Sequence, residues 1–201
     1  MRITGGQHRG RVIRTHVSGK GDGVRPTASR VREALFSMLG QDLSGISVLD
    51  AFGGSGILGL EAWSRGAEPV TIVERSRQMH QQIERTAKEL AAPVEVVRAE
   101  AQTMFRSEPR QMWDLVLLDP PYSDDPLLWA ERAAPSARWA LALEFRMGAT
   151  FPATLAHLEL VRERKYGQTG LVLYKSRTRA ESRGHESDIV SDDLGVIEDD
   201  R

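Results

Sequence analysis

The sequence predicts a mixed α/β fold. We expect a mostly parallel, Rossmann-like sheet with an antiparallel hairpin at its C-terminal end and a small basic hairpin at its N-terminus. Short apolar runs alternate with amphipathic stretches between residues 47 and 143, which is the order of a parallel sheet covered by helices on both faces. A glycine-rich turn follows the first run, and the two final strands lie close together in the chain, which favours a hairpin.

Each element is expected from its own pattern. A first helix should begin near Thr27, whose hydroxyl can cap it, and continue along an apolar stripe from Val31 to Leu39 that has helical spacing. The other expected helices are residues 57–65, 76–90, 101–105 and a segment within 126–133. The expected strands are residues 47–51, 70–73, 94–97, 115–118, 139–143, 159–165 and 171–174.

Composition excludes several classes of site. The chain has 201 residues and no cysteine, which excludes disulfides and thiolate metal sites. No apolar stretch is long enough to span a bilayer, and the N-terminus lacks a signal-peptide pattern. We therefore expect one main domain of a cytoplasmic protein, with no membrane association, no metal and no protein partner.

Charge is unevenly distributed, although the net charge is only −1. Residues 1–32 hold eight Lys or Arg against one acid, and residues 180–201 hold eight acids against two arginines. The basic segment favours polyanion binding, with a solvated surface as the simpler alternative, and the acidic end favours a disordered tail. We expect a basic extension at 1–24, the main domain at 25–178 and the tail at 179–201.

The segment Asp119-Pro120-Pro121-Tyr122 is the most informative feature of the chain. It follows the apolar run 115–118, and two prolines cannot continue a central strand. A carboxylate, a rigid turn and an aromatic ring are therefore presented at the carboxyl end of a strand, where ligands of open α/β sheets bind. Asp119 and the Pro120 carbonyl can accept the two N–H bonds of a planar amine while Tyr122 stacks on its ring. These three are the expected catalytic residues.

A glycine-rich turn follows the first predicted strand. The segment 54–59 matches the dinucleotide-binding fingerprint, and Glu74 lies about 20 residues further on, where a ribose-binding acid belongs. A NAD-binding domain is therefore one interpretation. S-adenosylmethionine fits better, because it carries a ribose diol and cationic groups but no phosphate that the carboxylate of Asp50 would repel.

The expected cofactor-binding residues lie around this turn and at the ends of the next two strands. They are Asp50, Phe52, Gly54, Gly56, Glu74 and Glu100. Each of the three acids also has a simpler interpretation than cofactor binding. Asp50 could cap the loop, Glu74 could be an ordinary surface acid, and Glu100 could be favoured by the dipole at a helix N-terminus.

Motifs along most of the chain carry a family resemblance. They are Met1-Arg2-Ile3-Thr4-Gly5-Gly6, Arg9-Gly10-Arg11, Arg25-Pro26-Thr27, the run Arg30 to Phe36, Val48-Leu49-Asp50, Gly54-Ser55-Gly56, Leu58-Gly59, Ser64 to Ala67, Val73-Glu74 and Leu118 to Tyr122. From Met1 to about Lys175 the chain resembles the RsmD family, bacterial methyltransferases of a guanine N2 amine in small-subunit ribosomal RNA. It departs from the family pattern at Ala51-Phe52-Gly53, where Leu-Phe-Ala is usual, and at Glu100, where Asp is usual.

The resemblance implies an S-adenosylmethionine-dependent methyltransferase domain at 25–178, with RNA docking by the extension at 1–24. The substrate would be a guanine N2 amine of 16S ribosomal RNA, in the free RNA or in a small-subunit assembly intermediate. Two alternatives stay open. One is an amino-methyltransferase of another RNA or of adenine in DNA, and the other is a non-catalytic RNA-binding assembly factor.

Five arginines of the basic segment lie before the predicted catalytic motifs, which are complete without them. We therefore hypothesise that these arginines contact RNA phosphates. These residues are Arg9, Arg11, Arg25, Arg30 and Arg32. Arg30 and Arg32 could instead pair with acids of the fold, since Glu33 is adjacent in the sequence.

Overall fold

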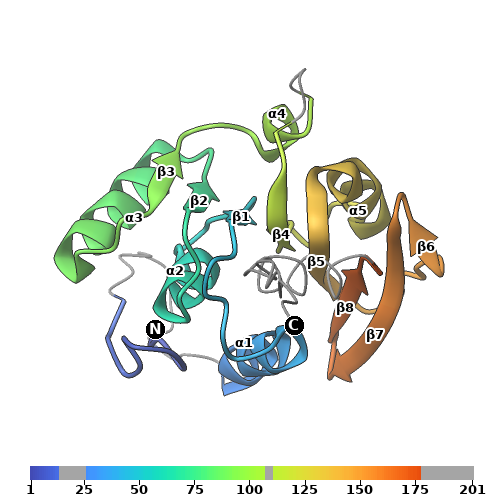
Figure 1. The fold of residues 1–201 in the computed structure, drawn as a ribbon, viewed down its shortest axis with the longest axis horizontal. Coiled ribbons are helices and arrows are strands. Elements are labelled where there is room, and N and C mark those ends of the chain that lie inside the picture. Colours follow the sequence, from blue (N-terminus) through green and yellow to red (C-terminus); the bar gives the residue numbers. More distant parts are fainter. Residues whose placement is uncertain (14–25, 107–110, 178–201) are drawn as a thin grey trace, which may run out of the picture.

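The computed structural model describes residues 1–13, 26–106 and 111–177, which form one eight-stranded sheet with helices on both faces (Figure 1). The strands are β1 (Val48–Asp50), β2 (Val70–Val73), β3 (Glu95–Val97), β4 (Trp113–Leu118), β5 (Ala137–Arg146), β6 (Thr154–Leu155), β7 (Leu158–Tyr166) and β8 (Thr169–Lys175). The helices are α1 (Pro26–Leu39), α2 (Ile57–Ser64), α3 (Arg77–Leu90), α4 (Ala101–Met104) and α5 (Pro126–Ala133), followed by the 3₁₀ turn η1 (Ala134–Ser136).

The strand order across the sheet is β3-β2-β1-β4-β5-β8-β7-β6. Strands β1 to β5 run parallel to one another, and β8, β7 and β6 each pair antiparallel with their neighbours. The predicted fold class is therefore confirmed, including the antiparallel C-terminal strands. The chain reverses its direction of travel across the sheet between β1 and β4, and ligands of open α/β sheets bind beside such a switch point.

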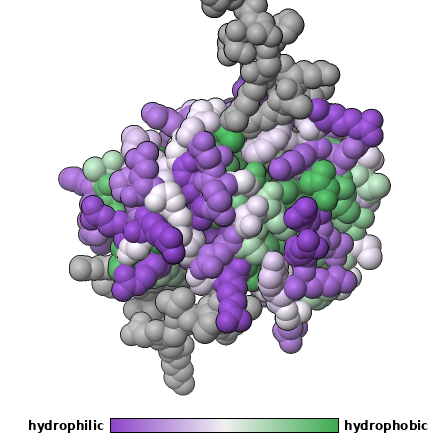
Figure 2. All heavy atoms as spheres, turned by 60° about the horizontal axis from the view of Figure 1, so that its bottom comes forward, coloured by the Kyte–Doolittle hydropathy of each residue, from purple (hydrophilic) through white to green (hydrophobic). Residues whose placement is uncertain are grey.

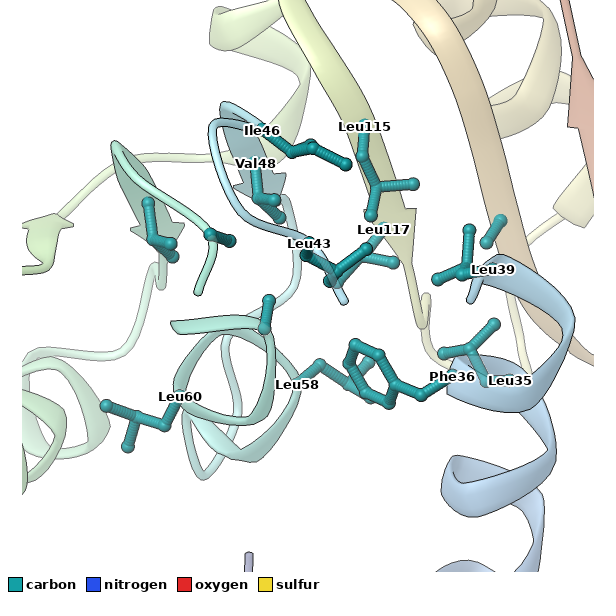
Figure 3. Close-up of a cluster of buried hydrophobic side chains, with 14 of the residues drawn as sticks. Leu35, Phe36, Leu39, Leu43, Ile46, Val48, Leu58, Leu60, Leu115 and Leu117 are labelled. Atoms are coloured by element: carbon teal, nitrogen blue, oxygen red, sulfur yellow. The ribbon is translucent and has the colours of Figure 1, made fainter. Parts of the chain in front are cut away.

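Two hydrophobic cores hold the helices to the sheet, one on each face. The central strands β1 and β2 are buried along their whole length, as expected for parallel strands covered on both sides. Helices α1, α2 and α3 contribute to the first core, and α4 and α5 to the second. Figure 3 shows part of the first core, where side chains of α1 and α2 meet those of β1 and β4. The labelled members include Leu35, Phe36, Leu58, Val48 and Leu117.

The N-terminal segment, residues 1–13, packs against the sheet domain. Ile3 and Ile13 are fully buried in the first core, and Arg2 forms an antiparallel bridge with Val12. The rest of the predicted basic hairpin lies outside the described residues, as does the acidic tail. The domain boundaries therefore stay predictions.

A buried carboxylate, Glu61 of α2, joins this N-terminal segment to the helices. Glu61 is completely buried and accepts hydrogen bonds from the amide of Thr4 at 2.8 Å and from its hydroxyl at 2.7 Å. Its oxygens also pair with Arg32 of α1 at 3.4 Å and with Arg65 at 2.7 Å. Three segments that are distant in the sequence therefore meet at the carboxylate of Glu61, whose negative charge is compensated by two arginines.

Short elements differ from the sequence-based expectation. Helix α1 begins at Pro26, so Thr27 lies within its first turn and not before it. Proline suits a first turn because its missing N–H would have no helical partner there. The two-residue strand β6 and the three-residue turn η1 were not predicted, because segments of this length give no periodic signal.

Candidate active site

A cavity of about 420 Å³ opens at the carboxyl ends of the parallel strands, at the place where the switch point leads us to expect a ligand. Its volume lies in the range of small-molecule sites. Most of the predicted cofactor and catalytic residues line this one cavity: Phe52, Gly54, Glu74, Glu100, Asp119, Pro120 and Tyr122. The structure therefore brings together residues that are spread over about a third of the chain.

Asp50 lies beneath the turn that follows β1, where it is fully buried. Its carboxylate accepts hydrogen bonds from the amide of Gly59 at 2.9 Å and from the amide of Phe52 at 3.4 Å. Burial raises the pKa of Asp50 to about 7, and these two hydrogen bonds oppose the shift. This geometry lets Asp50 hold the turn against α2, and a direct contact with a cofactor stays a prediction.

The turn itself depends on glycine for two different reasons. Gly56 has a φ of 77°, and a Cβ at this position would lie 3.0 Å from Ile83 of α3. Gly54 has a φ of 52° and faces the cavity, and a Cβ added there would have only the Phe52 carbonyl within 4 Å. A ligand can therefore approach the backbone closely at Gly54.

Two acids stand at the ends of β2 and β3. Glu74 accepts from the amide of Gly54 at 2.8 Å and from that of Ser76 at 2.6 Å, so its carboxylate is fixed at the cavity wall. Each of its oxygens keeps a second lone pair that can accept a hydroxyl. Glu100 lies 3.8 Å from Arg75, and both side chains are more than half exposed, so this ion pair contributes little to stability.

The loop after β4 is held by contacts to two other elements. The hydroxyl groups of Tyr122 and of Thr169 on β8 lie 3.1 Å apart. The indole N–H of Trp129 on α5 donates to Asp124 at 3.1 Å, and Asp125 caps α5 by accepting amides of its first turn. The ring of Tyr122 remains about half exposed, so it can stack on a ligand without moving.

Asp119 borders the cavity and is accessible from it, but protein encloses much of its carboxyl group. Burial raises the pKa of Asp119 to about 6. The group is therefore mainly ionised at neutral pH, where it can only accept hydrogen bonds. This is the protonation state that an amine-binding role requires.

Glu144 and Trp129 are among the cavity residues that were not predicted from the sequence. Glu144 is the only acid in the ten residues of β5, and a charged residue in a mostly buried strand was the signal that could have revealed it. Trp129 meets Phe52 edge to face, with ring centroids 4.9 Å apart. No local pattern in the sequence indicates that contact, because the two rings belong to different elements.

Three of the predicted RNA-binding arginines, Arg9, Arg11 and Arg30, are exposed. The N-terminal segment and α1, which lie at the bottom of Figure 1, face forward in Figure 2, and hydrophilic residues predominate on this face. A hollow on this side is lined by Arg2 and Arg9, and also by Glu33. This surface can therefore present positive charge to a polyanion.

Arg32 lies in a different environment, because it is buried and ion-paired with Glu61. It also donates a hydrogen bond to the Arg2 carbonyl at 2.8 Å. The acid that it pairs with is thus on α2 and is not its neighbour Glu33. We leave Arg32 out of the proposed RNA surface, and Arg25 lies outside the described residues.

Two other kinds of feature are absent from the described part of the chain. No group of three or more His, Asp or Glu side chains there is arranged to hold a metal ion. No helix within the same ranges combines the length and the apolar composition needed to cross a membrane.

Comparison with known proteins places this chain in a family. A protein-family model described as Conserved hypothetical protein 95 matches residues 1–175. The chain is also 34% identical over 188 residues to Ribosomal RNA small subunit methyltransferase D of Escherichia coli K12, an alignment that covers 90% of this chain and 93% of that protein. The chain belongs to the RsmD family.

Solved structures agree with this membership. The structure described as putative methyltransferase yhhF from Escherichia coli matches this RsmD-family chain with a TM-score of 0.74 and 32% identity, covering 88% of this chain and 97% of the other. A putative methyltransferase complexed with SAH, SMU.776, matches with a TM-score of 0.60 over 73% of this chain and 48% of the other. Its 12% identity supports a likeness of fold alone.

Proposed function

We propose that this protein transfers a methyl group from S-adenosylmethionine to the exocyclic N2 amine of a guanine in small-subunit (16S) ribosomal RNA. The observation that carries the proposal is that Asp119, Pro120 and Tyr122 line the same cavity as Glu74 and the glycine turn. An amine-binding group and a nucleoside-binding group thus face one space. The names of the RsmD-family relatives supply the class of substrate.

The residues around the turn fit a nucleoside cofactor without phosphate. Glu74 would accept the ribose hydroxyls, Phe52 and Trp129 supply aromatic surface, and Glu100 can accept an adenine amine. When bound, S-adenosylmethionine would supply the electrophilic methyl group. The acidic wall of the cavity favours its positive charges and would disfavour the pyrophosphate of NAD.

The residues after β4 would prepare the amine for attack. The lone pair of an aromatic amine is delocalised into the ring, which makes it a poor nucleophile. When Asp119 and the Pro120 carbonyl accept its two N–H bonds, the lone pair turns toward the methyl group. The methyl group would pass from sulfur to this nitrogen with release of S-adenosylhomocysteine, and Asp119, which would hold the amine, would take the proton that the nitrogen then loses. Orientation of this kind can contribute about 7–11 kcal/mol.

Substitution of Glu74 by alanine should weaken binding of S-adenosylhomocysteine, measured by calorimetry, by about tenfold or more. The change removes acceptors from the ribose and also releases the Gly54 amide that Glu74 holds at 2.8 Å, and a hydrogen bond to a charged group contributes about 1.5–3 kcal/mol. Glu131→Ala, an exposed acid on α5, is the matched control. Saturable NAD binding together with no response to S-adenosylhomocysteine would contradict the cofactor assignment.

We infer that the N-terminal segment docks RNA through phosphate contacts. Replacement of Arg9 and Arg11 by glutamine should weaken RNA binding and reduce its salt slope by about one unit for each phosphate that is no longer neutralised, without changing cofactor affinity. The measurement is RNA affinity across a salt series. Arg85 and Arg138, also exposed, form a control pair of equal charge. Equal slopes for the two double variants would leave residues 1–13 with a structural role only.

The decisive experiment for the function follows the methyl group from labelled S-adenosylmethionine. We expect label in 16S RNA of small ribosomal subunits or their assembly intermediates, on a guanine N2 amine, and none in DNA. Label in adenine of DNA would favour the other amino-methyltransferase class, and RNA binding without transfer would favour an assembly factor. A substrate of this kind also leads us to infer that the protein acts in the cytoplasm.

A further inference from the structure

The cavity contains a second carboxyl group beside Asp119 that the proposed reaction has not yet used. The last registered pair of the parallel strands β4 and β5 is Leu118 with Leu143. Asp119 directly follows the end of β4, and Glu144 is the next residue of β5. Paired residues of neighbouring parallel strands point to the same face. Both line the cavity. Two carboxyl groups therefore lie side by side where the amine is expected to bind.

These two groups are arranged to share one proton at neutral pH. Burial and the negative charge of Asp119, which follows β4, together raise the pKa of Glu144 to about 8, and the positive charge of Arg32 on α1 opposes this shift. On β8, the residue opposite Glu144 is the apolar Leu171. The pKa of Asp119 lies lower, at about 6. At neutral pH the pair therefore favours a state with one charge and one proton, because neighbouring carboxyl groups disfavour double ionisation, and the higher pKa of Glu144 makes it the preferred site of that proton.

We propose that Glu144 recognises the guanine ring by accepting its N1–H bond with the carboxyl C=O and donating its own O–H to O6. Asp119 and the Pro120 carbonyl would meanwhile hold the N2 amine. This role rests on the proposed function, and it adds a specificity-determining residue to the same pocket.

A neutral carboxyl group suits this edge of guanine. The N1–H and O6 of the base form a donor and an acceptor side by side, and a protonated carboxyl group offers the complementary acceptor and donor. Ionised Glu144 would instead place lone pairs against O6. Adenine presented by its amine would offer a ring acceptor and a C–H in these places, so that one of the two hydrogen bonds would be lost and a buried polar group left unpaired.

The test compares Glu144→Ala and Glu144→Gln in the full-length protein, with Glu131→Ala as the control for loss of an acid elsewhere. The measurements are kcat/KM for methyl transfer to small ribosomal subunits, its pH profile, and calorimetric binding of S-adenosylhomocysteine. We expect Glu144→Ala to lower kcat/KM by about tenfold to a hundredfold, the scale of one bidentate base contact. Glu144→Gln should stay near wild type, because an amide offers the same acceptor and a donor.

The pH profile separates recognition from packing. Wild-type activity should fall above about pH 8, as Glu144 loses its proton, whereas Glu144→Gln should lack this alkaline decline. Full activity of Glu144→Ala, or a Glu144→Gln variant as slow as Glu144→Ala with intact cofactor binding, would overturn the proposal. Failure of the wild-type protein to methylate guanine would instead overturn the proposed function, so the two failures are distinguishable.

Discussion

Replacing Asp119 with alanine is expected to reduce methyl transfer by about a hundredfold or more, while affinity for S-adenosylhomocysteine stays near that of the wild type. Asp119 would accept an N–H bond of the reacting amine, and loss of one preorganised polar contact to a reacting group reduces turnover by about 10²–10³. The cofactor contacts proposed above come from other loops, so they survive the change. Single-turnover transfer and calorimetry measure the two effects separately.

Asp119→Asn provides the closest control, because it preserves shape and removes charge. The amide would keep one acceptor oxygen but would turn a donor toward the amine in half of its orientations, so we expect activity between alanine and wild type. Removal of Asp119 also removes the negative charge that raises the pKa of Glu144. Near-normal turnover of Asp119→Ala would refute the role assigned to this carboxylate.

Glu61→Ala is expected to lower the free energy of unfolding by about 3–5 kcal/mol, the usual effect of breaking a buried ion pair on one side. The substitution leaves Arg32 and Arg65 buried without their shared carboxylate and removes the acceptor of two Thr4 hydrogen bonds. Urea denaturation with linear extrapolation measures the change. We also expect this variant to be cleaved faster by proteases within residues 1–13, because Glu61 holds that segment to α2.

The matched control is Glu84→Ala, which removes another helical glutamate with a partner four residues away. Glu84 lies 3.4 Å from His80, and its side chain is about half exposed, so its removal should change stability by only about 0.3–0.5 kcal/mol. Equal stability of the Glu61 and Glu84 variants would show that the buried cluster does not hold the N-terminal segment in place.

Sequence patterns predicted those parts of the structure that depend on residues close together in the chain. The strands and helices of the sheet domain follow from short apolar runs and periodic stripes, and the positions of Glu74 and Asp119 follow from the rule that ligands meet the carboxyl ends of parallel strands. Even the antiparallel end could be predicted, because the segments at β7 and β8 leave no room for a crossover helix.

The parts that escaped prediction depend on partners distant in the chain. Pairing of Arg32 with an acid of the fold was an expected alternative, but the sequence did not indicate that Glu61, on another helix, would be that acid. Glu144 becomes a site residue only through the register that sets β5 next to β4. Trp129 reaches the cavity through contacts with Phe52 and Asp124, and no spacing in the sequence encodes them.

The position of β8 in the sheet bears on how the protein is made. β8 is the last strand that the structure describes, yet it lies between β5 and β7. While the chain emerges from the ribosome, the parallel half can assemble early, but β5 keeps an unpaired edge of mostly apolar residues until β8 arrives. Such edges can pair with other chains. A nascent chain that stalls before residue 169 would therefore carry the complete glycine-rich turn after β1 and an aggregation-prone edge at the same time.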